Sequence, residues 1–196
     1  MQTSAADLLR GIFDSTVSAH VRFAEERLAV VVAASEAISR ALAAGRKVLA
    51  FGNGGSAGDA EHLVAELVGR FERERRGLPA VSLTSDSSVV TAIANDYGYG
   101  VLFARQIEAL GATGDIAFGI STSGRSANVE AGLAAAKRGG LITIALTGRD
   151  GGKMGADADI HLNVAEQSTA RVQEVHRTIL HGICALLDRD SAGPRS

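Results

Sequence analysis

Histidine, carboxyl and amide side chains occur at helical spacing in two separate parts of the chain. His62 and Glu66 are four residues apart in a segment with a helical pattern, so both side chains emerge from one face of that helix. A helical segment near the other end of the sequence carries Gln173 and His181. A carboxylate and an imidazole beside a carbonyl compound can move a proton between adjacent carbons, and each group contributes on the order of 10² to 10⁴ in rate. These residue types therefore indicate acid–base chemistry.

The same side chains also offer donor atoms for a metal ion. Two imidazoles, a carboxylate and an amide oxygen form a borderline zinc site, and this role is compatible with acid–base chemistry. Gln173 and His181 are eight residues apart, and a rise of 1.5 Å per residue separates their Cα atoms by about 12 Å. One ion could join both only through nearly extended, opposed side chains. We therefore predict that, if both serve one site, they come from different subunits, and the expected partner is a copy of this chain.

Two glycine- and serine-rich turns each follow an apolar run and precede a helical pattern. The first covers residues 51–56 (FGNGGS) and the second covers residues 120–126 (ISTSGRS). Glycines let the backbone approach a ligand, hydroxyls and free amides donate hydrogen bonds, and the positive end of each helix dipole favours a phosphate dianion. The second turn holds more hydroxyls than one helix cap requires, and Ser56 adds another on the first turn. The two turns therefore predict a site for one phosphorylated small molecule.

Familiar nucleotide-binding motifs do not fit these turns. The G-x-G-x-x-G spacing that begins at Gly52 fails because Ala57 occupies the last position, which disfavours NAD. The Gly-Lys pair at residues 152–153 runs into Met154 rather than Ser or Thr, which excludes a Walker P-loop.

The roles of three further polar residues, Arg70, Asn95 and Asp96, can be interpreted in more than one way. Arg70 either faces the phosphate or solvates a helix end. The Asn95-Asp96-Tyr97-Gly98 segment predicts a helix stop followed by a cap, so that Asp96 taken alone is a structural residue.

The elements that must hold these side chains alternate between strands and helices. A helical pattern over residues 5–44, as one long or two consecutive helices, precedes short apolar strands without polar alternation, which is typical of a parallel sheet buried on both faces. The alternation predicts an α/β fold with a three-layer, doubly wound, five-stranded parallel sheet, similar to flavodoxin. The expected strands are 47–51, 80–83, 115–120, 141–146 and 159–163, and the expected helices are 57–71, 87–95, 98–110, 126–138 and 168–188.

The length of 196 residues is in the usual range of a single domain. We expect one domain over residues 1–196, with N-terminal helices over 1–45, an α/β core over 46–189 and a frayed tail over 190–196. Ligands in such folds bind beyond the carboxyl ends of the strands, where both turns are expected to lie.

Composition excludes several classes of function. Lys and Arg number 20 against 22 acidic residues, so the chain has no basic excess for binding a nucleic acid. The single cysteine, Cys184, indicates a reducing compartment and a buried thiol rather than a disulfide framework. No apolar run approaches the roughly 20 residues of a membrane span, and the sequence does not begin with the order of a secretion signal. We therefore expect a soluble, cytoplasmic protein that binds neither nucleic acid nor membrane.

Taken together, these motifs resemble the phosphoheptose isomerases of the sugar isomerase (SIS) family over nearly the whole chain. The serine turn is typical of the whole superfamily. The set of His62, Glu66, Gln173 and His181 is specific to a much narrower group of proteins. The motifs that carry the resemblance are Gly52-Asn53-Gly54-Gly55-Ser56, His62 with Glu66, Ala94-Asn95-Asp96, Ser121-Thr122-Ser123-Gly124-x-Ser126, and Arg171-x-Gln173-Glu174-x-His176 followed by His181.

The resemblance implies conversion of sedoheptulose 7-phosphate to D-glycero-D-manno-heptose 7-phosphate through an enediol, the first step of nucleotide-activated heptose biosynthesis. By analogy, Glu66 takes the carbon-bound proton and His181 is the complementary acid or base. The implied phosphate contacts are Ser121, Thr122, Ser123 and Ser126, with Ser56 and Arg70 as further substrate-binding candidates. The implied sugar contacts are Asn53, Gly54, Gly55, Asn95, Asp96 and Gln173.

The resemblance also implies zinc bound by His62, Glu66, Gln173 and His181, and a homotetramer with sites between subunits. We therefore expect Glu66 and His181 to converge on the sugar across a contact between chains. A Glu66 held on zinc is a weaker base, because the cation lowers the pKa of the carboxyl group and occupies its lone pairs. Zinc then organises the site more than it polarises the substrate.

A rival function comes from other SIS relatives, which bind replication-initiator proteins and act as assembly factors without isomerising sugars. Those relatives generally lack the equivalents of Glu66 and His181. Both residues are present here, which favours the enzyme.

Overall fold

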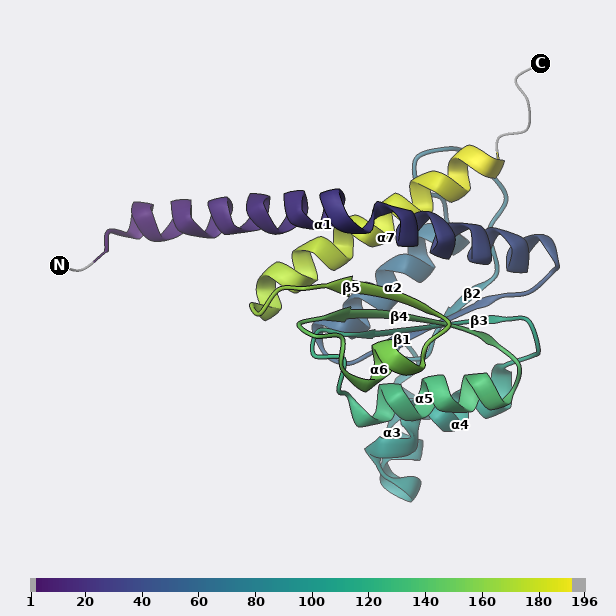
Figure 1. Cartoon of the computed structure of the whole chain (residues 1–196). Helices are drawn as coiled ribbons and strands as arrows, with labels where there is room; N and C mark the ends of the chain where they lie inside the picture. The colour runs from purple at the N-terminus through teal and green to yellow at the C-terminus, as the bar shows by residue number, and fades with distance from the viewer. Residues whose placement is uncertain (1–2, 192–196) are drawn as a thin grey trace, which may run out of the picture.

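The computed structural model describes residues 3–191, and a five-stranded parallel sheet forms its centre (Figure 1). The strands lie in the order β2-β1-β3-β4-β5, and each is parallel to its neighbours. Every residue of β1 and β3 is buried, which confirms that apolar runs without polar alternation predict a sheet covered on both faces. The bounds are β1 Val48–Gly52, β2 Ala80–Ser82, β3 Ile116–Ser121, β4 Ile142–Gly148 and β5 Ile160–Val164.

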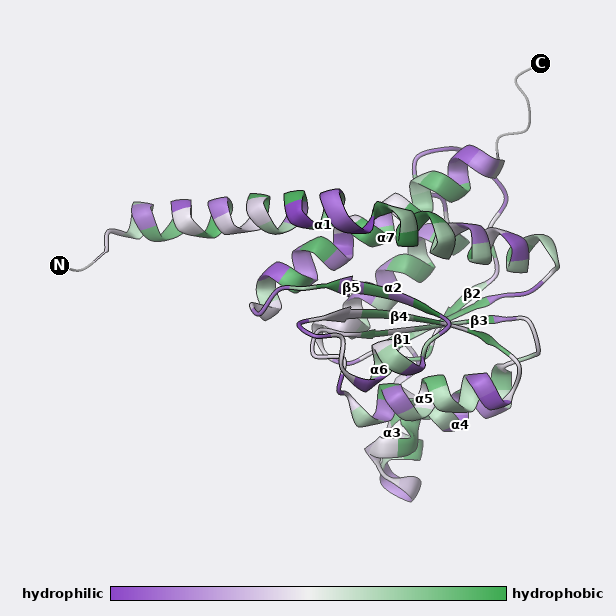
Figure 2. Cartoon of the chain, viewed as in Figure 1, coloured by the Kyte–Doolittle hydropathy of each residue, from purple (hydrophilic) through white to green (hydrophobic). Residues whose placement is uncertain are grey.

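Helices cover both faces of the sheet and complete three layers (Figure 1). One apolar core lies between the sheet and α1, α2 and α7, and a second lies between the sheet and α3, α4, α5 and α6. In Figure 2 the strands between these layers are mostly green, which marks the apolar centre. The helices are α1 Ala5–Ala43, α2 Gly55–Val68, α3 Ser87–Tyr97, the 3-10 turn η1 Tyr99–Val101, α4 Leu102–Leu110, α5 Ala127–Arg138, α6 Gly152–Asp157 and α7 Thr169–Ser191. The doubly wound α/β fold is confirmed.

The strand order places the two glycine- and serine-rich turns side by side. After β1, the chain forms β2 at one edge of the sheet. It then crosses to the other side of β1 and adds β3, β4 and β5 in order toward the opposite edge. In a sheet of this order the ligand crevice lies at the reversal, between β1 and β3. Gly52 at the end of β1 is in register with Ile120 of β3, so the two following turns start at the same level of the sheet.

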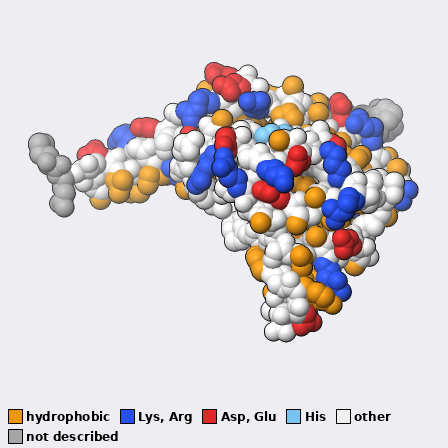
Figure 3. All heavy atoms as spheres, turned by 60° about the horizontal axis from the view of Figure 1, so that its bottom comes forward, with side chains coloured by type: hydrophobic (Ala, Val, Ile, Leu, Met, Phe, Trp, Pro, Cys, Tyr) orange, Lys and Arg blue, Asp and Glu red, His pale blue; other side chains and the backbone are white. Residues whose placement is uncertain are grey.

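The N-terminal segment is one continuous helix, α1, of 39 residues. Ser4 is its N-cap, because the Ser4 side chain accepts a hydrogen bond from the Asp7 backbone N–H at 3.1 Å. The first part of α1 projects beyond the body of the protein, and orange side chains run along this projection (Figures 1 and 3). The exposed apolar residues in this part are Leu8, Leu9, Ile12, Phe13, Val17 and Val21.

Several boundaries differ from the sequence prediction. Helix α2 begins two residues earlier than expected and ends at Val68, followed by Gly69 as its C-cap. The expected helix over 98–110 starts with the turn η1, because Gly98 has a φ of 86° and interrupts the helix. The short helix α6 was not predicted, since six residues with two glycines give no helical periodicity. Helix α7 includes residues 190 and 191 of the expected frayed tail, and residues 192–196 lie outside the described part of the chain.

Within residues 3–191, no helix combines the length and the apolar character that crossing a lipid bilayer requires.

Candidate active site

The first turn joins the end of β1 to α2 at the crevice of the sheet. Gly54 is the N-cap of α2 and has a φ of 56°, a left-handed conformation that favours glycine. Gly52 is required for a different reason, because a Cβ there would lie 2.9 Å from the backbone oxygen of Ile120 on the neighbouring strand. As a glycine, Gly54 has no side chain with which to cap α2. The N–H groups of Ser56 and Ala57 donate to the backbone oxygens of Asn53 and Gly54, each at 3.0 Å, so among the first N–H groups of α2 the one on Gly55 is available to an anion.

The second turn joins β3 to α5 and gathers serine hydroxyl groups. The Oγ atom of Ser121 lies 2.8 Å from the Oγ of Ser126 and 3.3 Å from the Oγ of Ser123. Ser121 is buried, whereas Thr122, Ser123 and Ser126 are partly exposed. Ser126 is the N-cap of α5, yet its side chain makes no capping bond to that helix. The hydroxyls bond to one another rather than to the helix end, and the Oγ of Ser123 also accepts from the Arg125 backbone N–H at 3.2 Å.

A pair of asparagines connects the two turns. Asn53 follows β1, and Asn128 lies in the first turn of α5; their side-chain amides exchange two hydrogen bonds of 2.8 and 2.9 Å. The hydroxyl group of Tyr99 also donates to Oδ1 of Asn53 at 3.0 Å. Sequence reasoning selected Asn53 but missed Asn128 and Tyr99, because no local motif connects residues so distant in the chain.

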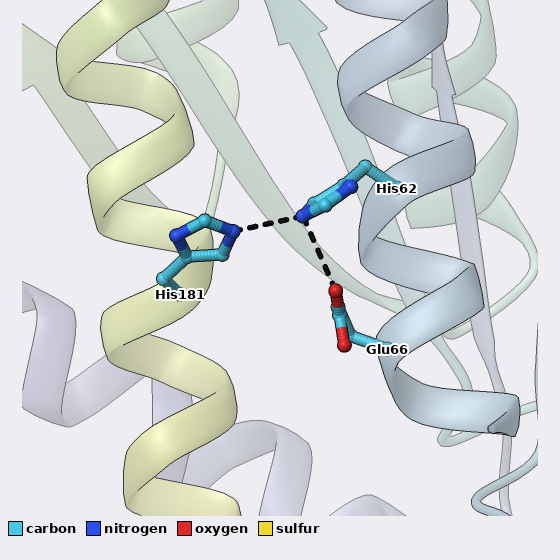
Figure 4. A group of neighbouring side chains, drawn as sticks. All are labelled: His62, Glu66 and His181. Carbon is cyan, nitrogen blue, oxygen red and sulfur yellow. Dashed lines mark hydrogen bonds and ion pairs between the residues drawn. The ribbon is translucent and has the colours of Figure 1, made fainter. Parts of the chain in front are cut away.

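Three of the predicted acid–base and metal-binding side chains meet on the side of α2 that faces α7. Nε2 of His62 lies 2.8 Å from Nε2 of His181 and 3.4 Å from Oε1 of Glu66 (Figure 4). Glu66 and His62 project from α2, and His181 projects from α7, so one ring nitrogen of His62 lies between the other two groups (Figure 4). All three belong to the same chain. The expectation that Glu66 and His181 converge across a contact between chains is therefore wrong, because α2 and α7 are neighbours within one subunit.

A charged pair lies one helical turn before this cluster. Asp59 is buried, and its Oδ1 lies 2.8 Å from an Arg177 guanidinium nitrogen. Burial raises the pKa of Asp59, although Arg177 acts in the opposite direction. Burial is also the main cause that lowers the pKa of His62; Arg177 adds to this effect, and the nearby Glu66 carboxylate opposes it. The neutral form of His62 is favoured, and this form has a lone pair for a proton or a metal ion.

The cluster provides three of the four ligands that a zinc site was expected to have. His62, Glu66 and His181 offer one ligand atom each, and these atoms all lie within 4.8 Å of one another. Two imidazoles and a carboxylate, with a fourth position open, are the ligand types of a catalytic zinc site. Gln173 is not part of this group in its own chain, because its side chain contacts Gly55 at the start of α2.

The remaining predicted residues lie at other places. Arg70 follows the end of α2, with its guanidinium 3.9 Å from the Glu74 carboxylate and far along the helix from the phosphate turns of the same chain. Asn95 and Asp96 lie in the last turn of α3, joined by a 2.8 Å hydrogen bond between their side chains. The predicted helix stop at residues 95–98 is therefore shifted, since the helix continues to Tyr97 and Gly98 is its C-cap.

The fold and the paired turns define a protein with a SIS domain, and residues 13–148 match the family model described by that name. The chain belongs to this family, and its identity of about half with curated proteins named phosphoheptose isomerase, over more than four fifths of its length, places it among those enzymes.

Proteins of that name align with nearly all of the chain. The phosphoheptose isomerase of Roseiflexus sp. (strain RS-1) is 48% identical over 176 residues, which cover 90% of this chain and 89% of the relative. The enzyme of Halorhodospira halophila is 52% identical over 166 residues, covering 83% and 84%. The solved structure of phosphoheptose isomerase from Neisseria gonorrhoeae has a TM-score of 0.91 and 41% identity, and covers 95% of this chain and 100% of that chain. The structure from Francisella tularensis has a TM-score of 0.92 and 36% identity, with the same coverage.

Proposed function

We propose that this protein is an aldose–ketose isomerase that converts sedoheptulose 7-phosphate to D-glycero-D-manno-heptose 7-phosphate. The observation that carries the proposal is the meeting of Glu66 and His181 beside His62, in a chain that also has two phosphate-type turns. Phosphoheptose isomerases at 48% and 52% identity support the same substrate. Nothing among the similar proteins supports the alternative of a factor that associates with a replication initiator.

The phosphate-binding part of the proposal uses the two turns at the crevice. The hydroxyl cluster and the uncapped starts of α2 and α5 are suited to hold the phosphate dianion. The proposed phosphate contacts are Ser56, Ser121, Thr122, Ser123 and Ser126. The proposed sugar contacts are Asn53, Gly54, Gly55, Asn95, Asp96 and Gln173, and Arg70 is a further proposed contact.

The proton-transfer part uses the histidine and carboxylate cluster. Glu66 removes the proton from the carbon next to the ketone, which forms an enediol, and then returns a proton to the former carbonyl carbon. His181 delivers a proton to the former ketone oxygen and accepts one from the hydroxyl oxygen that becomes the aldehyde. His62 lies between the two groups, where its hydrogen bond to His181 fixes the orientation of that ring.

We extend the proposal to a zinc ion held by His62, Glu66 and His181. A bound zinc ion would hold these three side chains in place more than it would polarise the substrate as a Lewis acid. The fourth expected ligand, Gln173, would have to come from another subunit, because α7 places it eight residues before His181.

A homotetramer with sites between subunits completes the proposal. Gly55 and Glu66 are eleven residues apart on α2, which separates the phosphate turn from the carboxylate by roughly 16 Å along the helix axis. This span is longer than a seven-carbon sugar phosphate, which favours a site whose phosphate turns and proton-transfer groups come from different copies. The exposed apolar residues of α1 offer a surface for such association. A cytoplasmic location agrees with the buried, unpaired thiol of Cys184.

The test is the formation of the aldose from sedoheptulose 7-phosphate by the purified protein. Parallel reactions with unphosphorylated sedoheptulose show whether the phosphate is required. We expect turnover only of the phosphorylated sugar. A protein that binds sedoheptulose 7-phosphate without turning it over would be a binding module rather than an isomerase.

A further inference from the structure

The amide of Asn53 is almost fully occupied by contacts within the protein. A side-chain amide has two acceptor lone pairs on oxygen and two N–H donors on nitrogen. Both lone pairs of Asn53 Oδ1 are used, one by Nδ2 of Asn128 at 2.9 Å and one by the hydroxyl group of Tyr99 at 3.0 Å. One of its two N–H groups donates to Oδ1 of Asn128 at 2.8 Å. A single N–H group of Asn53 remains available to a ligand.

The surroundings of this amide make its orientation specific. Asn128 is only 5% exposed and makes both of its side-chain hydrogen bonds to Asn53, so its amide is protected from exchange with water. The residues are 75 positions apart; Asn53 lies in the first turn and Asn128 lies at the start of α5, just after the second turn, so the pair also fixes the distance between the two turns. Tyr99 approaches from η1 and is half exposed, which makes it a neighbour of the crevice rather than of the core.

We propose that Asn128 and Tyr99 are positioning residues that restrict Asn53 to a single role, donation of one N–H to an oxygen acceptor of the bound sugar phosphate. This inference rests on the proposed function for the identity of the ligand. With both lone pairs occupied, Asn53 cannot accept a hydrogen bond from a sugar hydroxyl. The site therefore selects a carbonyl, hydroxyl or phosphate oxygen that acts as an acceptor at this point.

The first experiment compares two tyrosine variants that differ only in their relation to Asn53. Tyr99→Phe removes the hydroxyl that donates to Asn53, and Tyr97→Phe is the matched control. Tyr97 is similarly exposed, at 56% against 52% for Tyr99, but its hydroxyl accepts from Arg105 instead. We expect Tyr99→Phe to raise KM for sedoheptulose 7-phosphate roughly threefold to tenfold, the effect of one hydrogen bond, with the melting temperature unchanged. Equal KM values for the two variants would overturn the proposal.

The second experiment replaces Asn128 by a carboxyl group, whose protonation restores the hydrogen-bonding pattern that Asn53 has in the wild-type protein. Asn128→Asp places a carboxylate opposite the Asn53 oxygen, where the two acceptors repel each other. A protonated carboxyl can present one donor and one acceptor to Asn53, as the Asn128 amide does, and burial raises the pKa of such a group. We expect KM to rise about tenfold or more at pH 8, and the ratio of the variant KM to the wild-type KM to fall as the pH is lowered to 6. A purely structural loss would not recover on acidification.

Gln106→Glu is the control for the second experiment. Gln106, on α4, is another buried amide, 6% exposed, but it donates to the backbone oxygens of Leu83, just after β2, and of Leu102 on α4 rather than to either asparagine. The KM of the Gln106→Glu variant should stay at the wild-type value across the same pH range. A folded Asn128→Asp protein whose KM ratio is independent of pH contradicts the proposal, and if this variant does not fold, the tyrosine pair decides.

Failure of the proposed function would be visible separately. If the wild-type protein does not turn over sedoheptulose 7-phosphate, the same variants are compared by calorimetric titration with that sugar phosphate. Weaker binding by Tyr99→Phe than by Tyr97→Phe then supports the positioning role without isomerase activity. Equal affinities, or no binding by any of the proteins, overturn it.

Discussion

Nε2 of His62 and Nε2 of His181 lie 2.8 Å apart, although the two residues are 119 positions apart in the sequence. Two imidazole nitrogens at this distance can share only one proton, or can direct their lone pairs at a common cation. Glu66 faces the same His62 nitrogen at 3.4 Å. The arrangement therefore brings the proposed base, the proposed acid and a candidate metal site together in one cluster.

Loss of His62 should weaken zinc binding. His62→Ala removes one of three donors in the cluster, and we expect the dissociation constant for zinc to rise on the order of 100-fold. Competition with a chromophoric chelator measures this constant. His20→Ala is the control, because His20 lies on α1, where its ring bonds to the Thr16 backbone oxygen and to the Thr178 hydroxyl. Equal zinc affinity for the two variants would refute the assignment of His62 as a ligand.

Acid should destabilise the protein through His176. This side chain is fully buried, and burial lowers its pKa to about 4, while a hydrogen bond to the Thr147 backbone oxygen opposes the shift. The unfolded chain, with an ordinary pKa near 6.5, therefore binds more protons between these values. The stability gained by keeping His176 neutral is complete above about pH 6.5 and declines toward pH 4, by an amount on the order of 3 kcal/mol.

The measurement is urea unfolding at pH 7 and pH 5. We expect the wild-type protein to lose more free energy of unfolding on acidification than His176→Gln, which can still donate to the Thr147 oxygen but does not titrate. The same pH dependence in both proteins would show that other groups dominate acid unfolding.

The exposed apolar residues of α1 should be needed for association. Phe13 is 70% exposed in the single chain, which is unusual for a large aromatic side chain on a projecting helix. Phe13→Asp should shift the protein to smaller species in sedimentation velocity. Ser18→Asp introduces the same charge at an exposed polar position of α1 and should leave the sedimentation profile unchanged. A tetramer that is unaffected by Phe13→Asp would mean that another surface mediates assembly.

A buried ion pair should stabilise the end of α2 near Glu66. Asp188 accepts hydrogen bonds from the backbone N–H groups of Glu72 and Arg73 at 3.0 Å and from Nε of Arg75 at 2.8 Å. Arg75 in turn donates to the backbone oxygen of Glu66 at 2.8 Å. Asp188→Ala leaves a buried guanidinium without its partner, so the free energy of unfolding should fall by about 3–5 kcal/mol.

Chemical denaturation of Asp188→Ala beside Asp190→Asn measures this loss. The Asp190 carboxylate pairs with the exposed Arg189, so its replacement should change stability by no more than about 0.5 kcal/mol. Comparable losses in both variants would argue against a special role for the Asp188 pair.

The sequence predicted the sheet and the two turns well because their signals are local. Apolar runs identify strands that are buried on both faces, and glycines next to hydroxyl residues mark the turns at their carboxyl ends. Helix α6 gave no signal, because residues 152–157 are too few for a helical period. Asn128 was missed for another reason: its partner Asn53 is brought to it only by the pairing of β1 with β3.

The arrangement of the predicted metal ligands also depended on tertiary packing. Helices α2 and α7 lie side by side, and the contacts advance along both in the same direction, from Gly55 with Gln173, through Asp59 with Arg177, to His62 with His181. Spacing on α7 indicated correctly that Gln173 and His181 are far apart. It could not show that His181, rather than Gln173, lies opposite His62 in the same chain.

The most direct test of the account is the kcat of Glu66→Gln with sedoheptulose 7-phosphate, measured beside Glu61→Gln. Both residues lie on α2, but the Glu61 carboxylate accepts a hydrogen bond from the Thr84 hydroxyl and is not part of the histidine cluster. We predict that Glu66→Gln lowers kcat at least about 100-fold with little change in KM, whereas Glu61→Gln keeps the wild-type kcat within about twofold. Wild-type turnover by a correctly folded Glu66→Gln protein would contradict the assignment of Glu66 as the group that moves the proton.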